Sequence, residues 1–389
     1  MNTMVTEGKI NDIDRFIEYL ISNSTAEAPL WNMEMIRSHK PNHWNYIDGC
    51  MMTAEISLYE STGEEKYLKA CDSFVDWFVL DDGSIRTYDP MEKNLDNINM
   101  GRSLFPLYRY TGKEKYRKAM ENIRYQLKIQ PRTESGNFWH KEIYPNQVWL
   151  DGLYMAQPFY IEYENRFDNM RCCVDSFRQF QNVEKYMKDP KTGLYYHGFD
   201  ESRQMYWADP KTGCSRNFWL RSLGWFVCAL TDAAELFDEQ LYYEKRYLGT
   251  MLQNLVDSLA KWQDKDGLFY QIVNLPDLEG NYEETSGSAL IAYGVLKAVR
   301  LGILPERYAA IGEKAMEGLI RKKLIKNPDH TIGLDGICLV AGLGGKDHRD
   351  GSIAYYLSEP VVKNDAKGTA PFLLAYTELW CATRQVDNE

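Results

Sequence analysis

An aspartate at the start of an apolar run is the first feature of this sequence that can do chemistry. Residues 138–160 read FWHKEIYPNQVWLDGLYMAQPFY, and Asp151 stands just before the run that begins at Leu153. An aspartate in this place is typical of a helix N-cap. The aromatic residues around it also suit a sugar site, because aromatic faces stack on sugar rings and a carboxyl group can move protons. This stretch alone favours the cap; the remaining sequence shifts the balance toward the sugar site.

A second carboxyl group, Asp96, lies in LDNINMGRSLF, five residues before Gly101. Two carboxyl groups held close together raise one another's pKa and leave one of them as a proton donor near neutral pH. Asp96 and Asp151 are therefore candidates for such a pair, although Asp96 can equally anchor its loop. For Asp48, directly before Gly49, a helix-capping role is favoured over catalysis.

Two histidines occupy equivalent positions in repeated aromatic loops. The segment GNFWH, which ends at His140, recurs as GLYYH, which ends at His197, and as GLFYQ at residues 267–271. A lone histidine in a loop is usually a surface residue, but in these matching positions contact with a ligand is an equal alternative. The spacing of His39 and His43 resembles a pair of metal ligands, but no acidic residue or cysteine stands nearby, so we expect no metal.

The segment RNFWLRSLGW, residues 216–225, combines a cation with two indoles. A guanidinium such as that of Arg221 can grip a carboxylate with two hydrogen bonds. Trp219 and Trp225 can stack on a sugar, and core packing is the alternative for either of them.

A repeat predicts the elements that position these residues. Residues 62–70 (TGEEKYLKA) and 111–119 (TGKEKYRKA) are identical at seven of nine positions, and helical runs flank each copy. Repeats of this period are typical of stacked helical hairpins joined by short Thr-Gly turns.

Six helical runs open at a glycine and are apolar on nearly all sides, which is typical of buried helices. They begin at Gly49, Gly101, Gly152, Gly224, Gly287 and Gly368. Amphipathic partners lie between them, at residues 120–129, 168–188, 243–262 and 308–324. The sequence therefore predicts an all-α fold, an (α/α)6 barrel of six helical hairpins that forms a single domain over residues 1–389. An open solenoid is the alternative. The aromatic loops, with short β-strands, precede inner helices and should gather at the end that bears their N-termini, where helix dipoles favour anions.

Composition excludes several classes of protein. The chain has 389 residues and a net charge of −11, which argues against nucleic acid as a partner. No apolar run is long enough to span a membrane, and the first residues lack the pattern of a signal peptide. None of the eight cysteines forms a CxxC pair, which favours free thiols in a reducing compartment. We expect a cytoplasmic protein; the sequence does not indicate its oligomeric state.

The chain resembles glycoside hydrolase family 105, the unsaturated rhamnogalacturonyl hydrolases, and the related family 88 of unsaturated glucuronyl hydrolases. The resemblance covers nearly the whole length. It rests on WNYIDG (44–49), LDNINMGR (95–102), residues 138–160, YYHGFD (195–200), NFWLRSLGW (217–225) and GSIAYYLSEPVVKNDAKGTAPFLLAY (351–376).

The resemblance implies a barrel that removes a 4,5-unsaturated uronic acid from the non-reducing end of lyase-cut pectin oligosaccharides. In that family an aspartic acid protonates C4 of the enol ether, and a water activated by the same carboxylate adds at C5. The resulting hemiketal opens and releases the aglycone. No metal or organic cofactor is implied, and the partner is a small oligosaccharide. By resemblance, Asp151 is the acid and base with Asp96 beside it, and the subsite is lined by His197, Trp219, Arg221, Trp225, Tyr46 and His140.

Other functions remain open on the sequence alone. These are an unsaturated glucuronyl hydrolase, an inverting glycosidase, a sugar epimerase that uses His140 and His197, and a barrel that only binds glycans. The sequence also leaves the long last loop, residues 332–367, open between a fixed wall and a lid.

Overall fold

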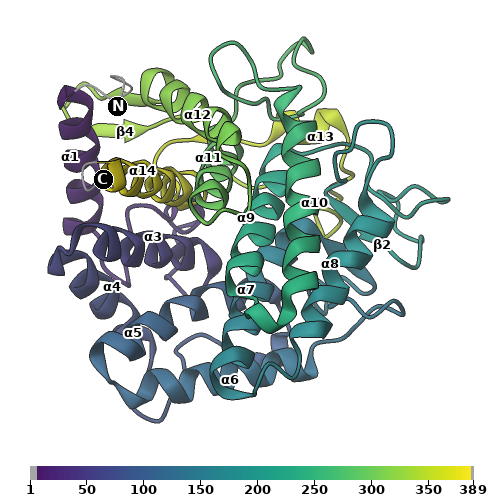
Figure 1. Ribbon diagram of the computed structural model, residues 1–389, viewed down its shortest axis with the longest axis horizontal. Helices are drawn as coiled ribbons and strands as arrows, with labels where there is room; N and C mark the ends of the chain where they lie inside the picture. Colours follow the sequence, from purple (N-terminus) through teal and green to yellow (C-terminus); the bar gives the residue numbers. More distant parts are fainter. Residues whose placement is uncertain (1–6, 387–389) are drawn as a thin grey trace.

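The computed structural model describes residues 7–386 and shows two concentric layers of helices (Figure 1). The inner layer consists of α3 (Tyr46–Thr62), η2 (Leu95–Ser103) with α5 (Leu104–Thr111), α7 (Leu150–Phe167), α9 (Leu220–Leu236), α11 (Thr285–Arg300) and α14 (Ala366–Val386). The outer layer consists of α1 (Glu7–Ser22), α4 (Glu65–Phe78), α6 (Glu114–Ile129), α8 (Cys173–Met187), α10 (Tyr242–Ala260) and α12 (Ala309–Lys322).

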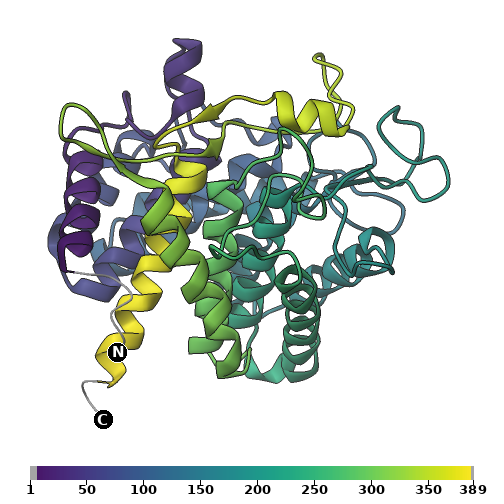
Figure 2. The same cartoon turned by 90° about the horizontal axis from the view of Figure 1, so that it is seen from above.

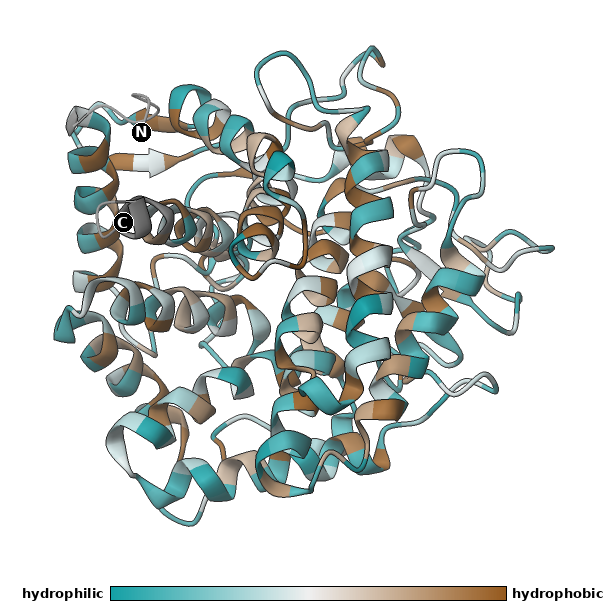
Figure 3. Cartoon of the chain, in the orientation of Figure 1, coloured by the Kyte–Doolittle hydropathy of each residue, from teal (hydrophilic) through white to brown (hydrophobic). Residues whose placement is uncertain are grey.

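The inner helices form a closed ring. Each packs against the next one in the chain, and α14 returns to pack against α3. The ring confirms the predicted (α/α)6 barrel and excludes the open solenoid. Burial agrees with it, because every residue of α9 from Leu220 to Ala234 is buried. Figure 3 shows brown, apolar residues interspersed with teal, hydrophilic ones along the outer helices, as expected of amphipathic helices.

Glycines allow the inner helices to approach one another closely. A Cβ atom on Gly287 would lie 2.3 Å from Cγ of Leu220, and one on Gly224 would lie 2.7 Å from Cβ of Leu290. The two glycines therefore face each other's helices across the α9–α11 contact. A Cβ on Gly49 would lie 2.7 Å from the backbone nitrogen of Met100. The glycines that mark these helices in the sequence thus stand where helices touch.

The second inner element differs from the regular helix that the sequence predicts from Gly101. Residues 95–103 form a 3-10 helix, and only residues 104–111 are α-helical. Pro106 lies in the first turn of α5, where its missing N–H is tolerated. Asp96 therefore lies in the first turn of the 3-10 helix η2, ahead of the α-helix α5.

The repeated Thr-Gly turns are confirmed as helix ends. Gly63 and Gly112 have φ angles of 75° and 66°, and their N–H groups donate to the carbonyls of Tyr59 and Tyr108. Glycine adopts this left-handed conformation without a Cβ clash, which is why it closes helices.

The long loops gather at one end of the barrel, the upper end in Figure 2. They carry three antiparallel pairs of short strands and two short helices. The pairs are β1 (Gln147–Trp149) with β2 (Gly198–Asp200), β3 (Leu324–Lys326) with β4 (Ile332–Leu334), and β5 (Ile337–Cys338) with β6 (Val361–Val362); the helices are α2 (Met33–Ser38) and α13 (Ile353–Ser358).

The sequence predicts that Asp48 caps α3, and this prediction is wrong. The cap is Asn45, whose side chain accepts a hydrogen bond from the Asp48 N–H. The carboxyl group of Asp48 is fully buried and accepts hydrogen bonds from Trp31, Asn42 and Asn45. Burial raises its pKa to about 6 despite these donors. Asp48 therefore ties the loop before α3 to the barrel.

The predicted domain bounds, 1–389, and the predicted absence of a signal sequence include residues 1–6 and 387–389, which lie outside the described structure. The single-domain prediction stays a prediction. All eight cysteines are free thiols, six of them buried. No helix within residues 7–386 is long and apolar enough to cross a membrane.

Candidate active site

Backbone hydrogen bonds draw the aromatic loops onto the N-termini of the inner helices. The N–H of Leu95 donates to the carbonyl of His140, that of Leu150 to His197, and that of Leu220 to Gln271, at 3.0–3.1 Å. The acceptors are the fifth residues of the three repeated aromatic loops. Each loop is therefore pinned to the inner helix that precedes it, and equivalent side chains meet at one mouth of the barrel.

Asp151 lies in the first turn of α7 and does not cap it. The cap position belongs to Trp149, which makes no capping hydrogen bond through its side chain. Asp151 is 9% exposed, and its Oδ2 lies 3.4 Å from Nε2 of His197. Neither atom has a hydrogen-bond partner among the described residues. Facing buried polar atoms without partners are rare and typical of functional sites.

Tyr356, on α13, fixes the orientation of His197. The imidazole is fully buried, and its Nδ1 lies 2.8 Å from the hydroxyl of Tyr356. Burial raises the pKa of Tyr356 well above its ordinary value, so the hydroxyl keeps its proton. Either Nδ1 or the hydroxyl can be the donor in this hydrogen bond, and in both cases the bond fixes the ring with Nε2 facing Asp151.

Asp96 forms a second group with His140 and Lys141. Its carboxylate lies 2.7 Å from Nζ of Lys141 and 3.5 Å from Nε2 of His140. Burial alone would raise the pKa of Asp96, but Lys141, His140 and Arg349 together outweigh it and hold this pKa below the ordinary value. Burial lowers the pKa of His140 to about 4, so its ring is neutral at physiological pH. Asp96 is therefore an ionised carboxylate, and the expectation that the two aspartates raise one another's pKa is corrected for Asp96.

Replacing Lys141 with methionine should destabilise the protein by about 2–3 kcal/mol at pH 7, because Asp96 would remain charged without its cation. The folded-state pKa of Asp96 is depressed, so its contribution to stability is present above its unfolded pKa and is lost as the pH falls through its folded pKa. The loss should therefore shrink at pH 4, where the variant's Asp96 is free to take up a proton. Urea unfolding at both pH values measures it, with the exposed and unpaired Lys69→Met as the control. An equal loss at both pH values would contradict the ion pair.

Stacked rings join the two carboxyl groups. Trp149 stacks on His140 at 4.3 Å and meets His197 edge-on at 5.4 Å. His197 in turn lies 4.7 Å from Trp219, which stacks on Tyr356 at 6.0 Å. Trp149 and Trp219 are equivalent, since each directly precedes an inner helix. The result is an aromatic wall that runs from Asp96 past Asp151 to α13.

Arg221 is more enclosed than the sequence suggests. Only 1% of it is exposed, and its guanidinium donates to Ser286 Oγ at 2.7 Å and to the carbonyls of Cys338 and Leu339. It also lies 3.8 Å from the buried carboxylate of Glu284. Protein acceptors therefore already hold this guanidinium, and the predicted contact of Arg221 with a substrate stays a prediction. Arg221 supports Trp219, whose ring lies 5.3 Å from the guanidinium carbon.

Tyr46 and Trp225, both predicted to line the subsite, differ in their exposure. Tyr46 is half-buried at the start of α3, where the charges of Asp96, Arg221 and Asp365 all act on it. Trp225 is 1% exposed and stacks on Tyr154 at 4.6 Å, within the packing between α9 and α7.

Three residues at this mouth were not singled out by sequence reasoning: Lys141, Tyr356 and Arg349. Lys141 directly follows His140, so its place next to a candidate residue could have indicated it from the sequence. Tyr356 meets His197 across 159 residues, and Arg349 meets Tyr144 across 205. No spacing pattern in a single sequence reports contacts of that range.

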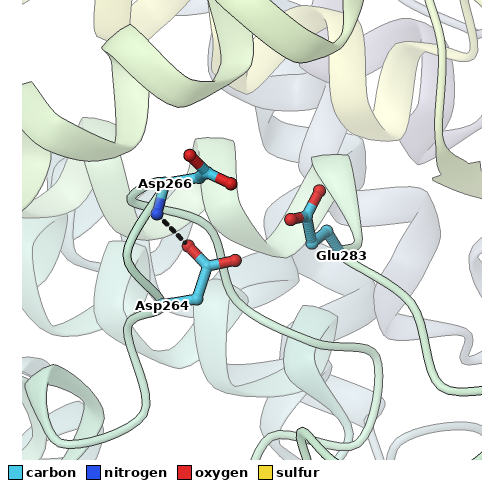
Figure 4. A group of neighbouring side chains, drawn as sticks. All are labelled: Asp264, Asp266 and Glu283. Carbon is cyan, nitrogen blue, oxygen red and sulfur yellow. Dashed lines mark hydrogen bonds between the residues drawn. The ribbon is translucent and has the colours of Figure 1, made fainter.

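One group within the described residues has the geometry of a metal site, and it includes neither Asp96 nor Asp151. Asp264, Asp266 and Glu283 place carboxylate oxygens within 4.8 Å of one another (Figure 4). Asp264 accepts from the Asp266 N–H, which closes a turn. Arg321 and Lys322 pair with Asp266, and Lys322 also pairs with Glu283. These cations balance the carboxylates, so the group is a charged turn.

The larger hollow on the barrel axis opens at the opposite mouth. This cavity of about 310 Å³ is lined by residues from all six inner elements. Its cations are all paired with carboxylates, as in Arg102–Asp232 at 2.6 Å and Arg300–Glu378 at 2.6 Å. A space of about 10 Å³ behind His140 and Trp149 is too small for a sugar. The group around Asp151 remains the candidate for chemistry. Its carboxyl group is largely buried but still 9% exposed, and it lies beside aromatic rings and the unpartnered Nε2 of His197.

Comparison with known proteins agrees with the arrangement. The model of Glycosyl Hydrolase Family 88 matches residues 14–382. The chain belongs to this family. A solved family 105 glycoside hydrolase from C. acetobutylicum ATCC 824 is 42% identical, with a TM-score of 0.85 over 93% of this chain and 99% of that one. The resemblance to family 105 is thereby confirmed. The protein is a glycoside hydrolase of the related families 88 and 105.

Two curated relatives extend the comparison. Protein Atu3128 of Agrobacterium fabrum is 40% identical over 231 residues, which is 58% of this chain and 97% of that protein. The unsaturated rhamnogalacturonyl hydrolase YesR of Bacillus subtilis is 28% identical over 264 residues, which is 66% of this chain and 72% of that protein.

Proposed function

We propose that the protein removes 4,5-unsaturated galacturonic acid from the non-reducing end of rhamnogalacturonan fragments by hydrating the enol-ether double bond. The observation that carries the proposal is the contact between Asp151 and His197, 3.4 Å apart and buried beside an aromatic wall. The name of the relative YesR supports the choice of substrate.

Asp151 acts first as an acid in this proposal. Its proton goes to C4, the double bond gives its electron pair to the new C–H bond, and positive charge develops at C5 and the ring oxygen. The Asp151 carboxylate then takes a proton from a water whose oxygen bonds to C5. The hemiketal opens, the aglycone leaves, and Asp151 is again protonated.

The neighbours of Asp151 suit this cycle. Nε2 of His197 lies 3.4 Å from Oδ2 of Asp151, where a proton on Nε2 stabilises the carboxylate that forms after proton transfer. Asp96, held ionised by Lys141, supplies negative charge near the oxocarbenium-like centre. Trp219 and Trp149 offer faces for the sugar ring. The enzyme works as a small-oligosaccharide hydrolase without a metal or organic cofactor, in the cytoplasm.

The test is a panel of lyase products. We expect the purified protein to abolish the ultraviolet absorbance of unsaturated galacturonyl-rhamnose faster than that of unsaturated glucuronyl disaccharides. The reverse order would reassign the substrate to glucuronyl products. Turnover of saturated galacturonides would favour an inverting glycosidase, and interconversion of free sugars would favour an epimerase. Binding without turnover would favour a glycan-binding barrel. Each of these three results would overturn the proposal.

A further inference from the structure

Arg349 stands at the tip of the long loop between β5 and α13, on the same mouth as Asp151. The loop reverses at Gly344 and Gly345, whose φ angles are 68° and 78°. The N–H of Gly344 donates to the carbonyl of Arg349 at 2.8 Å, which closes the turn. The sequence GLGGKDHRDG therefore presents one arginine on a tightly folded hairpin.

The guanidinium of Arg349 is held in place by neutral groups. Its Nε donates to the carbonyl of Gly344 at 3.0 Å, and its Nη2 donates to the hydroxyl of Tyr144 at 2.8 Å. A Cβ on Gly342 would lie 2.4 Å from Nη1, so the guanidinium packs directly against that glycine. Tyr144 stacks in turn on Trp149 at 5.1 Å. Arg349 is thus positioned in advance against the aromatic wall.

Arg349 lacks what other cations near this mouth have. No carboxylate of the described residues lies within 4.0 Å of it, whereas three buried or half-buried cations near this mouth each have one. The paired cations are Lys141 with Asp96, Arg221 with Glu284, and Lys367 with Asp365 and Glu34. Nη1 of Arg349 also donates to no described atom. A half-buried, fixed cation with free donors and no counter-ion is suited to an anionic ligand.

The charge of Arg349 reaches the candidate active site. It contributes to the lowering of the pKa of Asp96 and opposes the raising of the pKa of Tyr356. Asp96, Lys141 and Tyr356 belong to three different elements, and each is close enough to Arg349 for this effect. Arg349 therefore acts electrostatically on both ends of the aromatic wall, in keeping with its contact with Tyr144.

We propose that Arg349 binds the carboxylate of the unsaturated uronic acid, the role that the sequence suggested for Arg221. The proposal rests on the proposed function, and it names the residue that distinguishes an acidic sugar from a neutral one. Arg349 binds substrate and takes no part in proton transfer, so it contributes to the ground state and the transition state alike.

The test compares Arg349→Gln with the wild-type enzyme on an unsaturated galacturonyl disaccharide and on its methyl ester. For the acid, KM should rise roughly 10- to 100-fold, as expected for the loss of charge-assisted hydrogen bonds, with kcat little changed. For the ester, the two enzymes should differ little. On the acid, the KM of Arg349→Lys should lie between those of the wild-type enzyme and Arg349→Gln. Lysine keeps the positive charge but lacks the planar guanidinium that forms two hydrogen bonds with a carboxylate.

Arg216→Gln is the matched control, since Arg216 is exposed on a neighbouring loop and lies close enough to Asp350 to lower the pKa of that carboxyl. Equal effects of Arg349→Gln on acid and ester would overturn the proposal and indicate a structural role. An effect confined to longer oligosaccharides would also overturn it, because a second carboxylate would then be the partner. Failure of the wild-type enzyme on every unsaturated substrate would instead refute the proposed function, and is visible before any variant is made.

Discussion

Replacing Asp151 with asparagine should lower kcat by about 10³-fold on unsaturated galacturonyl substrates while the fold survives. The amide neither donates a proton to C4 nor accepts one from water, and general acid–base catalysis contributes roughly 10²- to 10⁴-fold. KM should change little, since the amide has the same shape as the carboxyl group.

The same substitution should leave stability unchanged or slightly higher. Oδ2 of Asp151 is buried and makes no hydrogen bond within the described structure, so the carboxyl group contributes little to the fold. Thermal unfolding measures this, with Asp168→Asn at the other end of α7 as the control. Full activity in folded Asp151→Asn would remove this residue from the mechanism. Loss of activity together with a collapse in melting temperature would show that Asp151 is structural.

Replacing Arg221 with methionine should destabilise the protein by about 3–5 kcal/mol. Removing one partner of a buried ion pair leaves the other without compensation, and here Glu284 would lose its cation and two backbone carbonyls would lose their donor. The side chain joins α9 to the start of α11 and to the loop after β5, so three segments would be loosened together. Urea unfolding gives the magnitude.

Arg216→Met, five residues earlier and exposed, is the control and should cost little. Arg221→Lys should recover part of the loss, because it restores the charge near Glu284 without the planar fork. A stable Arg221→Met with a raised KM for acidic substrates alone would contradict this account. It would return the carboxylate grip to Arg221 and remove it from Arg349.

The barrel was predictable because its signals are local and repeated. The glycines near the starts of the inner helices are required by contacts such as Gly287 with Leu220, and the aromatic loops share a position that bonds to the preceding inner helix. The site's elements followed from the same repeat, since His140 and His197 are equivalent residues of equivalent loops. Their placement beside Asp96 and Asp151 therefore agrees with the sequence.

What the sequence does not reveal depends on contacts between distant segments. Asp96 differs from its expected state because Lys141 lies 2.7 Å away, and a pKa depends on such distances. Arg221 sits in a sequence that suits a sugar site, yet its acceptors come from residues 286–339. Tyr356 and Arg349 belong to a long loop without a helical period, and only the folded chain shows which way that loop turns.

The most direct test of the hydration mechanism is a nuclear magnetic resonance analysis of the reaction in heavy water, quenched at early times. If Asp151 protonates the double bond, C4 of the released uronic acid carries one deuterium on a single face, and the ultraviolet absorbance is lost in step with release of the aglycone. Release of an unsaturated sugar whose double bond persists, followed by deuterium on both faces, would show that the glycosidic bond is cleaved first and would contradict the account.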